Sequence, residues 1–154
     1  MKLRIYTDTS VIGGCIDPEF RVASVRLVKR FKLGEAVVVL SELTLLELVN
    51  APGRVRDVLK GIPEEHREYV DLTTEAKELA ERYLKEGVIG QGKRIDAQHI
   101  AIATISHVDV LVSWNFRHIV NLARIRGYNS VNLRQGYPVL EIRSPLEVFV
   151  DEKS

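Results

Sequence analysis

The sequence predicts an α/β fold built around a parallel sheet. Residues 36–40 (Ala-Val-Val-Val-Leu) form a continuous apolar run without alternation, which is typical of a strand buried on both faces of a parallel sheet. Two further β-favouring segments, residues 3–7 and 110–112, are separated from this run and from each other by helical patterns. Strands that alternate with helices in this way predict parallel strands joined by crossover helices.

Length and composition fit one globular domain, which we expect to span residues 1–154. A chain of this length buries roughly two-thirds of its unfolded surface, and its hydrophobic content of 45% is ordinary. The single cysteine, Cys15, excludes an internal disulfide and a cysteine-based zinc site. A lone cysteine suits a reducing cytosol, so we expect a cytoplasmic protein. The first six residues are interrupted by charge, so we expect neither a signal peptide nor a membrane span there.

The net charge of +1 argues against indiscriminate binding of polyanions, but the charge is unevenly distributed. Residues 61–90 contain eight acids and four Lys or Arg, which gives −4. Residues 91–144 contain seven Lys or Arg and three acids, which gives +4. These charges either cover solvated helix faces or gather on one surface that steers a charged ligand, and the sequence leaves both interpretations open.

The first strand is predicted to end at Asp8. A short helical turn then begins with Asp8-Thr9-Ser10 and stops at Gly13-Gly14, and an amphipathic helix follows between Pro18 and Gly34. Asp8 therefore lies at the carboxyl end of a strand. Capping of the helical turn explains an Asp at this position equally well.

The second strand leads into a helix with Ser41 as its predicted N-cap and a stop at Pro52-Gly53. Its apolar face is predicted from four residues: Leu43, Leu46, Leu48 and Val49. Glu47 lies on or beside that face. A buried carboxylate requires a metal, a cation or strong hydrogen-bond donors, whereas a salt-bridged residue at the rim is the alternative interpretation.

The middle of the chain carries weaker patterns. Residues 55–59 are predicted as a short helix and residues 69–72 as an extended link rather than a full strand. Thr73 opens a long helix that reaches Lys85. The glycines in residues 87–92 match neither of the two common phosphate-loop patterns, which excludes a nucleotide-binding loop of those kinds.

Asp96 opens the next helix, which is almost wholly apolar from residue 100 to residue 105, and His99 lies on the same face as Asp96. An acid in a first turn is also explained by the helix dipole alone. The strand at residues 110–112 is followed by polar residues, and another helix continues from Asn121. A last strand is predicted at residues 140–143. Ser144-Pro145 then predicts a terminal helix through Val150.

The order of the polar residues along these elements points to one shared site. Asp8 ends the first strand, Glu47 follows the second, Asp96 opens a helix, and Ser113 and Asn115 follow the third strand. The carboxyl ends of parallel strands meet at one edge of the sheet, where α/β proteins bind ligands. Clustered carboxylates repel one another unless a hard cation such as Mg²⁺ or Mn²⁺ neutralises them. Such an ion can activate water for displacement at a phosphate.

These motifs resemble the PIN-domain family, and within it the VapC-like toxins of type II toxin–antitoxin systems. The resemblance covers nearly the whole chain and rests on four motifs: residues 8–12, Ser41 with Thr44 and Glu47, Arg94-Ile95-Asp96 with the helix that follows, and residues 111–115. It implies a three-layer α/β/α sandwich with a central, mainly parallel sheet. It further implies a Mg²⁺- or Mn²⁺-dependent endoribonuclease that cleaves structured RNA, forms a homodimer and is inhibited by a small antitoxin protein.

In this family the site carries a fourth acid, which is Asn115 here. The predicted metal ligands are the carboxylates of Asp8, Glu47 and Asp96 together with Asn115, and Ser113 and Asn115 are also expected to orient metal-bound water. An amide oxygen can still bind a metal or its water, but it adds no charge. Three carboxylates (−3) with one Mg²⁺ (+2) give −1, whereas two ions give +1, so one tightly bound ion is favoured.

The basic residues Arg94, Arg117 and Arg124 are predicted to contact RNA phosphates. His118 is predicted as a surface histidine near the loop, with a role in metal or substrate binding as the alternative. A metal-weak PIN module that binds RNA or a partner protein without cleaving it remains the second interpretation, because Asn115 replaces an acid. A receiver-like or phosphatase-like domain is set aside, since Asp8 is followed by Thr9-Ser10 rather than by an Asp-x-Asp-x-Thr pattern.

Overall fold

A computed structural model describes residues 2–148, and its centre is a five-stranded sheet in which all strands are parallel. The strand order is β3-β2-β1-β4-β5. The strands are β1 (Leu3–Thr7), β2 (Ala36–Ser41), β3 (Arg67–Val70), β4 (Val110–Val112) and β5 (Ile142–Arg143). The predicted parallel α/β fold is confirmed, and the last strand is two residues shorter at its start than predicted.

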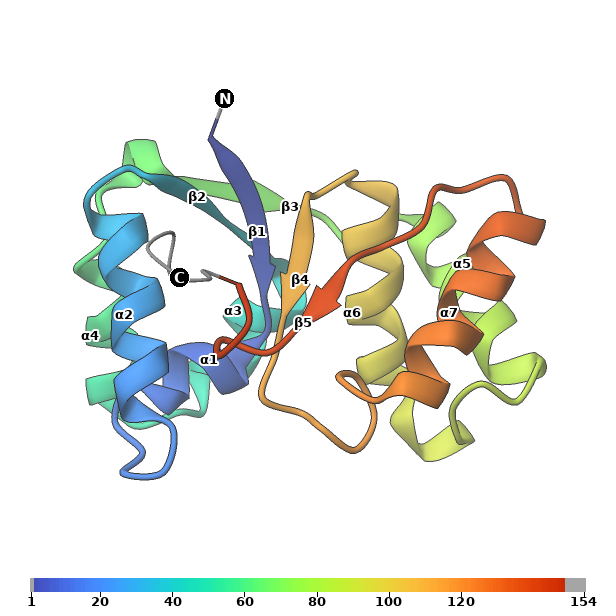
Figure 1. The fold of residues 1–154 in the computed structure, drawn as a ribbon, viewed down its shortest axis with the longest axis horizontal. Helices are drawn as coiled ribbons and strands as arrows, with labels where there is room; N and C mark the ends of the chain where they lie inside the picture. The colour runs from blue at the N-terminus through green and yellow to red at the C-terminus, as the bar shows by residue number, and fades with distance from the viewer. Residues whose placement is uncertain (1, 149–154) are drawn as a thin grey trace.

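Helices cover both faces of this sheet, so the three-layer α/β/α sandwich is also confirmed. In Figure 1, α1, α2 and α4 lie on one side of the sheet, and α5, α6 and α7 lie on the other. The helices are α1 (Thr9–Gly14), α2 (Arg21–Lys32), α3 (Glu42–Val49), α4 (Gly53–Lys60), α5 (Thr74–Lys85), α6 (Arg94–Ile105) and α7 (Leu122–Arg134). Two short 3₁₀ helices span Glu64–His66 and Gln91–Lys93.

The central strands bury side chains on both faces, which explains the apolar runs. Ile5 and Tyr6 are neighbours on β1 and both are fully buried. Ile5 packs into the core with α1, α2 and α4, whereas Tyr6 packs into the core with α5, α6 and α7. Successive side chains of a strand point to opposite faces, so β1 contributes to both cores at once.

The register of the strands brings their carboxyl ends to one edge. Thr7 at the end of β1 is paired with Val112 at the end of β4, so Asp8 and Ser113 follow neighbouring strands at the same level. Ser41 ends β2 on the other side of β1 and begins α3 as its N-cap. The carboxyl ends of β1, β2 and β4 therefore lie at one edge of the sheet, as predicted from the order of the motifs.

The prediction of an extended link at residues 69–72 is wrong, because Arg67–Val70 forms the edge strand β3. It pairs in parallel with β2 through Val38↔Arg67 to Ser41↔Val70. Its side chains are half-buried or exposed. An edge strand of this kind carries charged residues and needs no apolar run, so the sequence pattern gave too weak a signal.

The terminal helix predicted from Ser144-Pro145 through Val150 is wrong over the part that the structure describes. Residues 145–147 form a turn, in which the N–H of Glu147 donates to the carbonyl of Ser144 at 3.0 Å. The Ser144 hydroxyl also donates to the Glu147 carboxylate at 3.1 Å, so the serine closes a local turn. Residues 149 and 150 lie outside the described residues.

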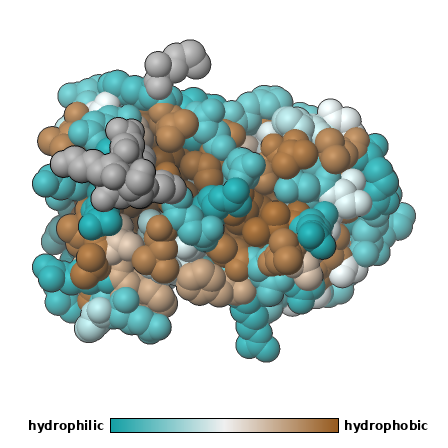
Figure 2. All heavy atoms as spheres, in the orientation of Figure 1, coloured by the Kyte–Doolittle hydropathy of each residue, from teal (hydrophilic) through white to brown (hydrophobic). Residues whose placement is uncertain are grey.

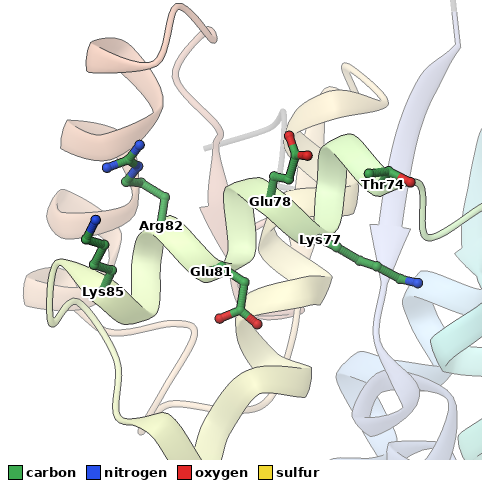
Figure 3. A pocket seen from close by; sticks show the side chains of 6 residues that line it. All are labelled: Thr74, Lys77, Glu78, Glu81, Arg82 and Lys85. Carbon is green, nitrogen blue, oxygen red and sulfur yellow. The ribbon is translucent and has the colours of Figure 1, made fainter.

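The acidic and basic segments partly pair with each other. Arg94 at the start of α6 forms an ion pair with Glu81 of α5 at 2.7 Å, and Arg134 of α7 forms one with Glu86. Figure 3 shows Glu81 pointing from α5 to the side opposite Arg82. The uneven charge distribution is therefore used in part to join helices of the same layer.

The surface carries both apolar and hydrophilic residues. In Figure 2, apolar residues run through the middle of the face that is also seen in Figure 1, and hydrophilic residues surround most of them. No helix within residues 2–148 combines the length and the apolar composition that a membrane crossing requires.

Gly14 lies where α1 packs closely against Trp114. The Trp114 indole Nε1 donates to Ser24 Oγ at 2.7 Å, and its ring stacks on Phe20 with centroids 4.4 Å apart. A Cβ on Gly14 would collide with Ser24 Oγ and lie 2.9 Å from Trp114 Nε1. Glycine at this position therefore permits the buried hydrogen bond between Trp114 and Ser24.

We expect Gly14→Ala to lower the free energy of unfolding by about 1–3 kcal/mol, because overpacking displaces buried groups. Urea unfolding measures this change. Gly13→Ala is the matched control, since no described atom beyond its chain neighbours and the backbone of its own helix lies within 4 Å of a Cβ at that position. Alanine is more stable than glycine inside a helix by roughly 0.5–1 kcal/mol, so the control is expected to be neutral or stabilised. Equal stability of the two variants would contradict this account of Gly14.

Candidate functional site

Asp8 is fixed at the end of β1 by three hydrogen bonds. Its Oδ1 accepts from the backbone N–H and the hydroxyl of Ser10 at 3.2 and 2.6 Å, and its Oδ2 accepts from the hydroxyl of Ser113 at 2.6 Å. Asp8 is the N-cap of α1, so the capping role considered from the sequence is confirmed. The residue is only 7% exposed. The carboxylate is thus held rigidly between two adjacent strands.

Burial raises the pKa of the Asp8 carboxyl above its ordinary value. His99 and the hydroxyls of Ser10 and Ser113 act in the opposite direction, and the negative charge of Glu47 adds to the rise. A carboxylate in this position is less stable in its charged form than in water. The charge of Asp8 is therefore only partly balanced by the protein itself.

Asp96 belongs to the same electrostatic environment. It lies in the first turn of α6 and is half-buried. Burial is the main cause of its raised pKa, and the charge of Asp8 adds to the rise, whereas His99, His118 and Lys93 lower it. The charge of Asp8 therefore acts on Asp96, and the charge of Glu47 acts on Asp8, although the three residues come from separate elements.

Glu47 lies at the rim of the site rather than in the core. Its side chain is 43% exposed, and Oε1 lies 2.9 Å from Nε2 of His99. The predicted apolar face is only partly correct, because Leu43 and Leu48 are buried whereas Leu46 and Val49 are 65% and 69% exposed. Glu47 lies beside the buried part of this face. The alternative of a paired rim residue fits the structure, and the partner is a histidine.

His99 is the functional candidate to which the sequence analysis assigned no role. It is only 2% exposed, and both ring nitrogens have partners, namely Tyr6 through Nδ1 at 2.6 Å and Glu47 through Nε2. Its position three residues after Asp96 was visible in the sequence. Its partners come from β1 and α3, so no local pattern could identify them.

The loop after β4 is shaped by Ser113 and Asn115. Ser113 Oγ donates to Asp8 and accepts the N–H of Asn115 at 2.9 Å. The amide Oδ1 of Asn115 accepts the N–H groups of Arg117 at 3.2 Å and of His118 at 2.9 Å. These two bonds occupy both lone pairs of the amide oxygen. Asn115 thus stabilises the loop, and its part as a metal ligand stays a prediction.

The three predicted phosphate-binding arginines differ in availability. The guanidinium of Arg94 is engaged by Glu81, and that of Arg124 donates to the carbonyl of Val88. Arg117 is exposed, and its guanidinium has no hydrogen bond or ion pair within residues 2–148. The pair with Glu81 is exposed on both sides, so it is weak and a phosphate could displace it.

Lys93 is a further cation that the sequence analysis did not select. It precedes Arg94 in the same motif, and its charge acts on both Asp96 and His118. His118 is half-buried rather than a simple surface residue, and burial is the main cause of its lowered pKa. A positive group therefore stands directly beside the carboxylates.

A cleft of about 430 Å³ adjoins the site. Its volume lies in the range of small-ligand sites in proteins, about 300–1,000 Å³. The lining includes two of the three carboxylates, one cation and exposed apolar residues: Glu47, Asp96, Lys93, Leu46 and Ile95. The cleft gives a ligand direct access to Glu47 and Asp96.

The oxygen donors fit a hard divalent cation by their chemistry. Burial raises the pKa of both Asp8 and Asp96, the charge of Glu47 adds to the rise at Asp8, and the charge of Asp8 adds to the rise at Asp96. A cation would relieve the repulsion among these carboxylates. Within residues 2–148, no group of three or more His, Cys, Asp or Glu side chains is placed to hold one ion. Mg²⁺ commonly retains several waters and is bound through only one or two carboxylates. The donor set therefore suits a partly hydrated ion.

The comparisons with known proteins identify the fold. No family model and no curated protein matches this sequence. Fourteen chains of solved structures match, and one of them belongs to the crystal structure of VapBC2 from Rickettsia felis bound to a DNA fragment from their promoter. That match covers 92% of this chain and 98% of the other, with a TM-score of 0.58 and 12% sequence identity.

The protein therefore has a PIN-like fold. The resemblance to VapC-like PIN proteins that was found in the sequence motifs is confirmed at the level of the fold.

We expect Asp8→Asn to raise the melting temperature of the metal-free protein at pH 7. A raised carboxyl pKa means that the folded protein binds a proton more readily than the unfolded chain, so stability falls as pH rises between the two pKa values. Asparagine removes this charge and remains a good N-cap. Each kcal/mol gained in the free energy of unfolding should raise the melting temperature by about 2–4 °C.

Thermal unfolding in EDTA between pH 4 and pH 8 measures this effect. The advantage of Asp8→Asn should shrink toward low pH, where wild type takes up its proton. Asp57→Asn, on the exposed side of α4, is the matched control and should show no such trend. A lower melting temperature for Asp8→Asn at every pH would show that its hydrogen bonds outweigh the burial of its charge.

Proposed function

We propose that this protein is a Mg²⁺- or Mn²⁺-dependent endoribonuclease of the VapC-like kind, formed as a single domain over residues 1–154, that cleaves structured RNA. The observation that carries the proposal is that the charge of Asp8 acts on Asp96, the charge of Glu47 acts on Asp8, and both Glu47 and Asp96 line an open cleft. The PIN-like fold supports it. The partial negative charge left on this site favours a divalent cation.

In this proposal Asp8, Glu47 and Asp96 hold the ion, directly or through water, and Asn115 contributes to its surroundings. When bound, the ion supplies an activated water and neutralises charge on the phosphate. Ser113 holds Asp8 in place and orients water together with Asn115. The protein thus provides fixed oxygen ligands in a partly buried position.

RNA would meet the site through the cations around the cleft. Lys93 and Arg117 are the available ones, because Lys93 stands beside Asp96 and Arg117 has no partner within residues 2–148. Arg94 and Arg124 can add to this set when phosphates replace their present partners, Glu81 and the Val88 carbonyl. Phosphate contacts of this kind position a nucleic acid without reading its sequence.

The second candidate function is a metal-weak PIN module that binds RNA or a partner protein without cleavage. Two observations favour it. The Oδ1 of Asn115 is already occupied by backbone N–H groups, and no three-ligand group lies within residues 2–148. In that case the carboxylates would serve to recognise a basic partner.

We further propose that the protein acts in the cytoplasm as a homodimer and is inhibited by a small antitoxin. The similar structure is of VapBC2 with a promoter DNA fragment, which supports a partner of the antitoxin type. Leu46, Val49 and Ile95 are exposed apolar residues next to the site, and such residues favour a protein interface there. Light scattering on the purified chain tests the dimer directly.

We expect purified protein to cleave a pool of structured RNAs in Mn²⁺ or Mg²⁺ and to be inactive in EDTA. Removal of a residue that only hydrogen-bonds to a metal ligand lowers activity by roughly 10- to 100-fold. Asp96→Asn removes a proposed ligand itself, so it should lower activity by more than this. Asn115→Asp should keep or raise activity, because an acid returns to the fourth position. If wild type is inactive and Asn115→Asp cleaves, the native protein is a binding module.

We expect Mn²⁺ to stabilise the wild-type fold, because a ligand that binds only the folded state adds about 2.7 kcal/mol at 100 times its Kd. Thermal unfolding with increasing Mn²⁺ measures this shift. Asp96→Asn at the same Mn²⁺ concentrations serves as the control for general effects of a divalent salt. A melting temperature that does not respond to Mn²⁺ favours the metal-weak module.

A further inference from the structure

A chain of hydrogen bonds leaves the first turn of α3, crosses the core and returns to the same helix. The N–H of Thr44 donates to Ser41 Oγ at 3.5 Å, and Ser41 Oγ lies 2.7 Å from the hydroxyl of Tyr6. That hydroxyl lies 2.6 Å from Nδ1 of His99, and Nε2 of His99 lies 2.9 Å from Oε1 of Glu47. The chain connects the N-cap of α3 with the rim carboxylate.

The donors and acceptors in this chain fix its direction. The Glu47 carboxylate can only accept, so Nε2 of His99 carries a proton, and in a neutral ring Nδ1 is then an acceptor. The Tyr6 hydroxyl then donates to Nδ1, and the Ser41 hydroxyl donates to the oxygen of Tyr6. Burial raises the pKa of Tyr6, so the phenol keeps its proton.

Glu47 depends on this chain for its position. Its side chain is 43% exposed on a helix of eight residues, and His99 is the only hydrogen-bond partner of its carboxylate within residues 2–148. A free Glu side chain has rotamer entropy worth about 1.5–2 kcal/mol, so without a partner it samples several orientations. His99 itself is held by Tyr6, which packs edge to face against it with ring centroids 5.8 Å apart.

The single hydrogen bond to His99 leaves the second carboxylate oxygen of Glu47 available to a ligand. His99 engages Oε1, whereas Oε2 has no hydrogen bond within residues 2–148. Glu47 lines the cleft next to Asp96, and its charge acts on Asp8. A carboxylate held at one oxygen and open at the other is suited to hold an ion or its water.

We propose that His99 is a positioning residue that, held by Tyr6 and Ser41, fixes Glu47 beside Asp8 and Asp96 and thereby sets the affinity of the site for a divalent ion. This inference rests on the proposed metal-dependent function. His99 acts through Glu47 and needs no contact with the ion or the RNA.

Two substitutions of His99 test the hydrogen bonds of its two ring nitrogens one at a time. In His99→Gln the side-chain amide nitrogen reaches the place of Nε2, so the donor to Glu47 is kept. In His99→Asn the shorter side chain reaches only the place of Nδ1, so the contact with Tyr6 is kept and Glu47 is released. We expect His99→Asn to weaken Mn²⁺ binding by roughly 10- to 100-fold and His99→Gln to weaken it much less.

Calorimetric titration with Mn²⁺ measures the affinity, and urea unfolding in EDTA measures the metal-free stability of the same variants. The double variant Glu47→Gln, His99→Asn should bind Mn²⁺ no more weakly than Glu47→Gln alone, because the two residues act through one contact. His99→Asn with wild-type Mn²⁺ affinity would overturn the proposal. Additive losses in the double variant would overturn it as well.

A second measurement on the metal-free protein separates this inference from the proposed function. The ¹⁵N shifts of the histidine rings report the tautomer of His99, which we expect to be protonated at Nε2 in wild type. Tyr6→Phe keeps the ring packing but removes the donor to Nδ1, and it should shift this tautomer. If wild type binds no Mn²⁺, the proposed function fails. A ring protonated at Nδ1 instead would show that the hydrogen-bond chain does not hold Glu47.

Discussion

The parallel pairing of β1 with both β2 and β4 is the constraint on which the site depends. Because β1 lies between the other two strands and runs in the same direction, Asp8 and Ser113, which follow their strands, and Ser41, which ends β2, lie at one edge. The register places Asp8 against Ser113, and a 2.6 Å hydrogen bond joins them. A shift of one residue would turn each of these side chains to the opposite face of its strand.

This edge collects more negative charge than the protein neutralises. Asp8 is buried and held by hydroxyl groups, which stabilise a carboxylate without cancelling its charge. The charge of Glu47 adds to the rise in the pKa of Asp8, and the charge of Asp8 to that of Asp96, whereas His99, His118 and Lys93 act in the opposite direction. A protein built for stability alone would not keep this arrangement, because burial of unpaired charge is unfavourable. Natural proteins often keep groups that lower the free energy of unfolding at positions where their activity requires those groups.

Much of the fold followed from local signals. The apolar run of β2, the N-cap of α3 at Ser41 and the turn that begins at Asp8 were all predicted from neighbouring residues, and the structure confirms them. The edge strand β3 and the turn after Ser144 were predicted wrongly. In both cases the backbone hydrogen bonds, with a distant strand or within a short turn, override the local pattern.

The sequence by itself determined which polar residues lie at strand ends and helix starts, because these positions are encoded locally and the carboxyl ends of parallel strands must meet at one edge. Only the tertiary structure decided how those residues are connected. Glu47 lies at the rim with His99 as its partner, and Arg94 is paired with Glu81, through contacts 52 and 13 residues apart in the chain. Hydrogen bonds over such separations depend on how helices pack across the sheet, which no periodic pattern along the chain records.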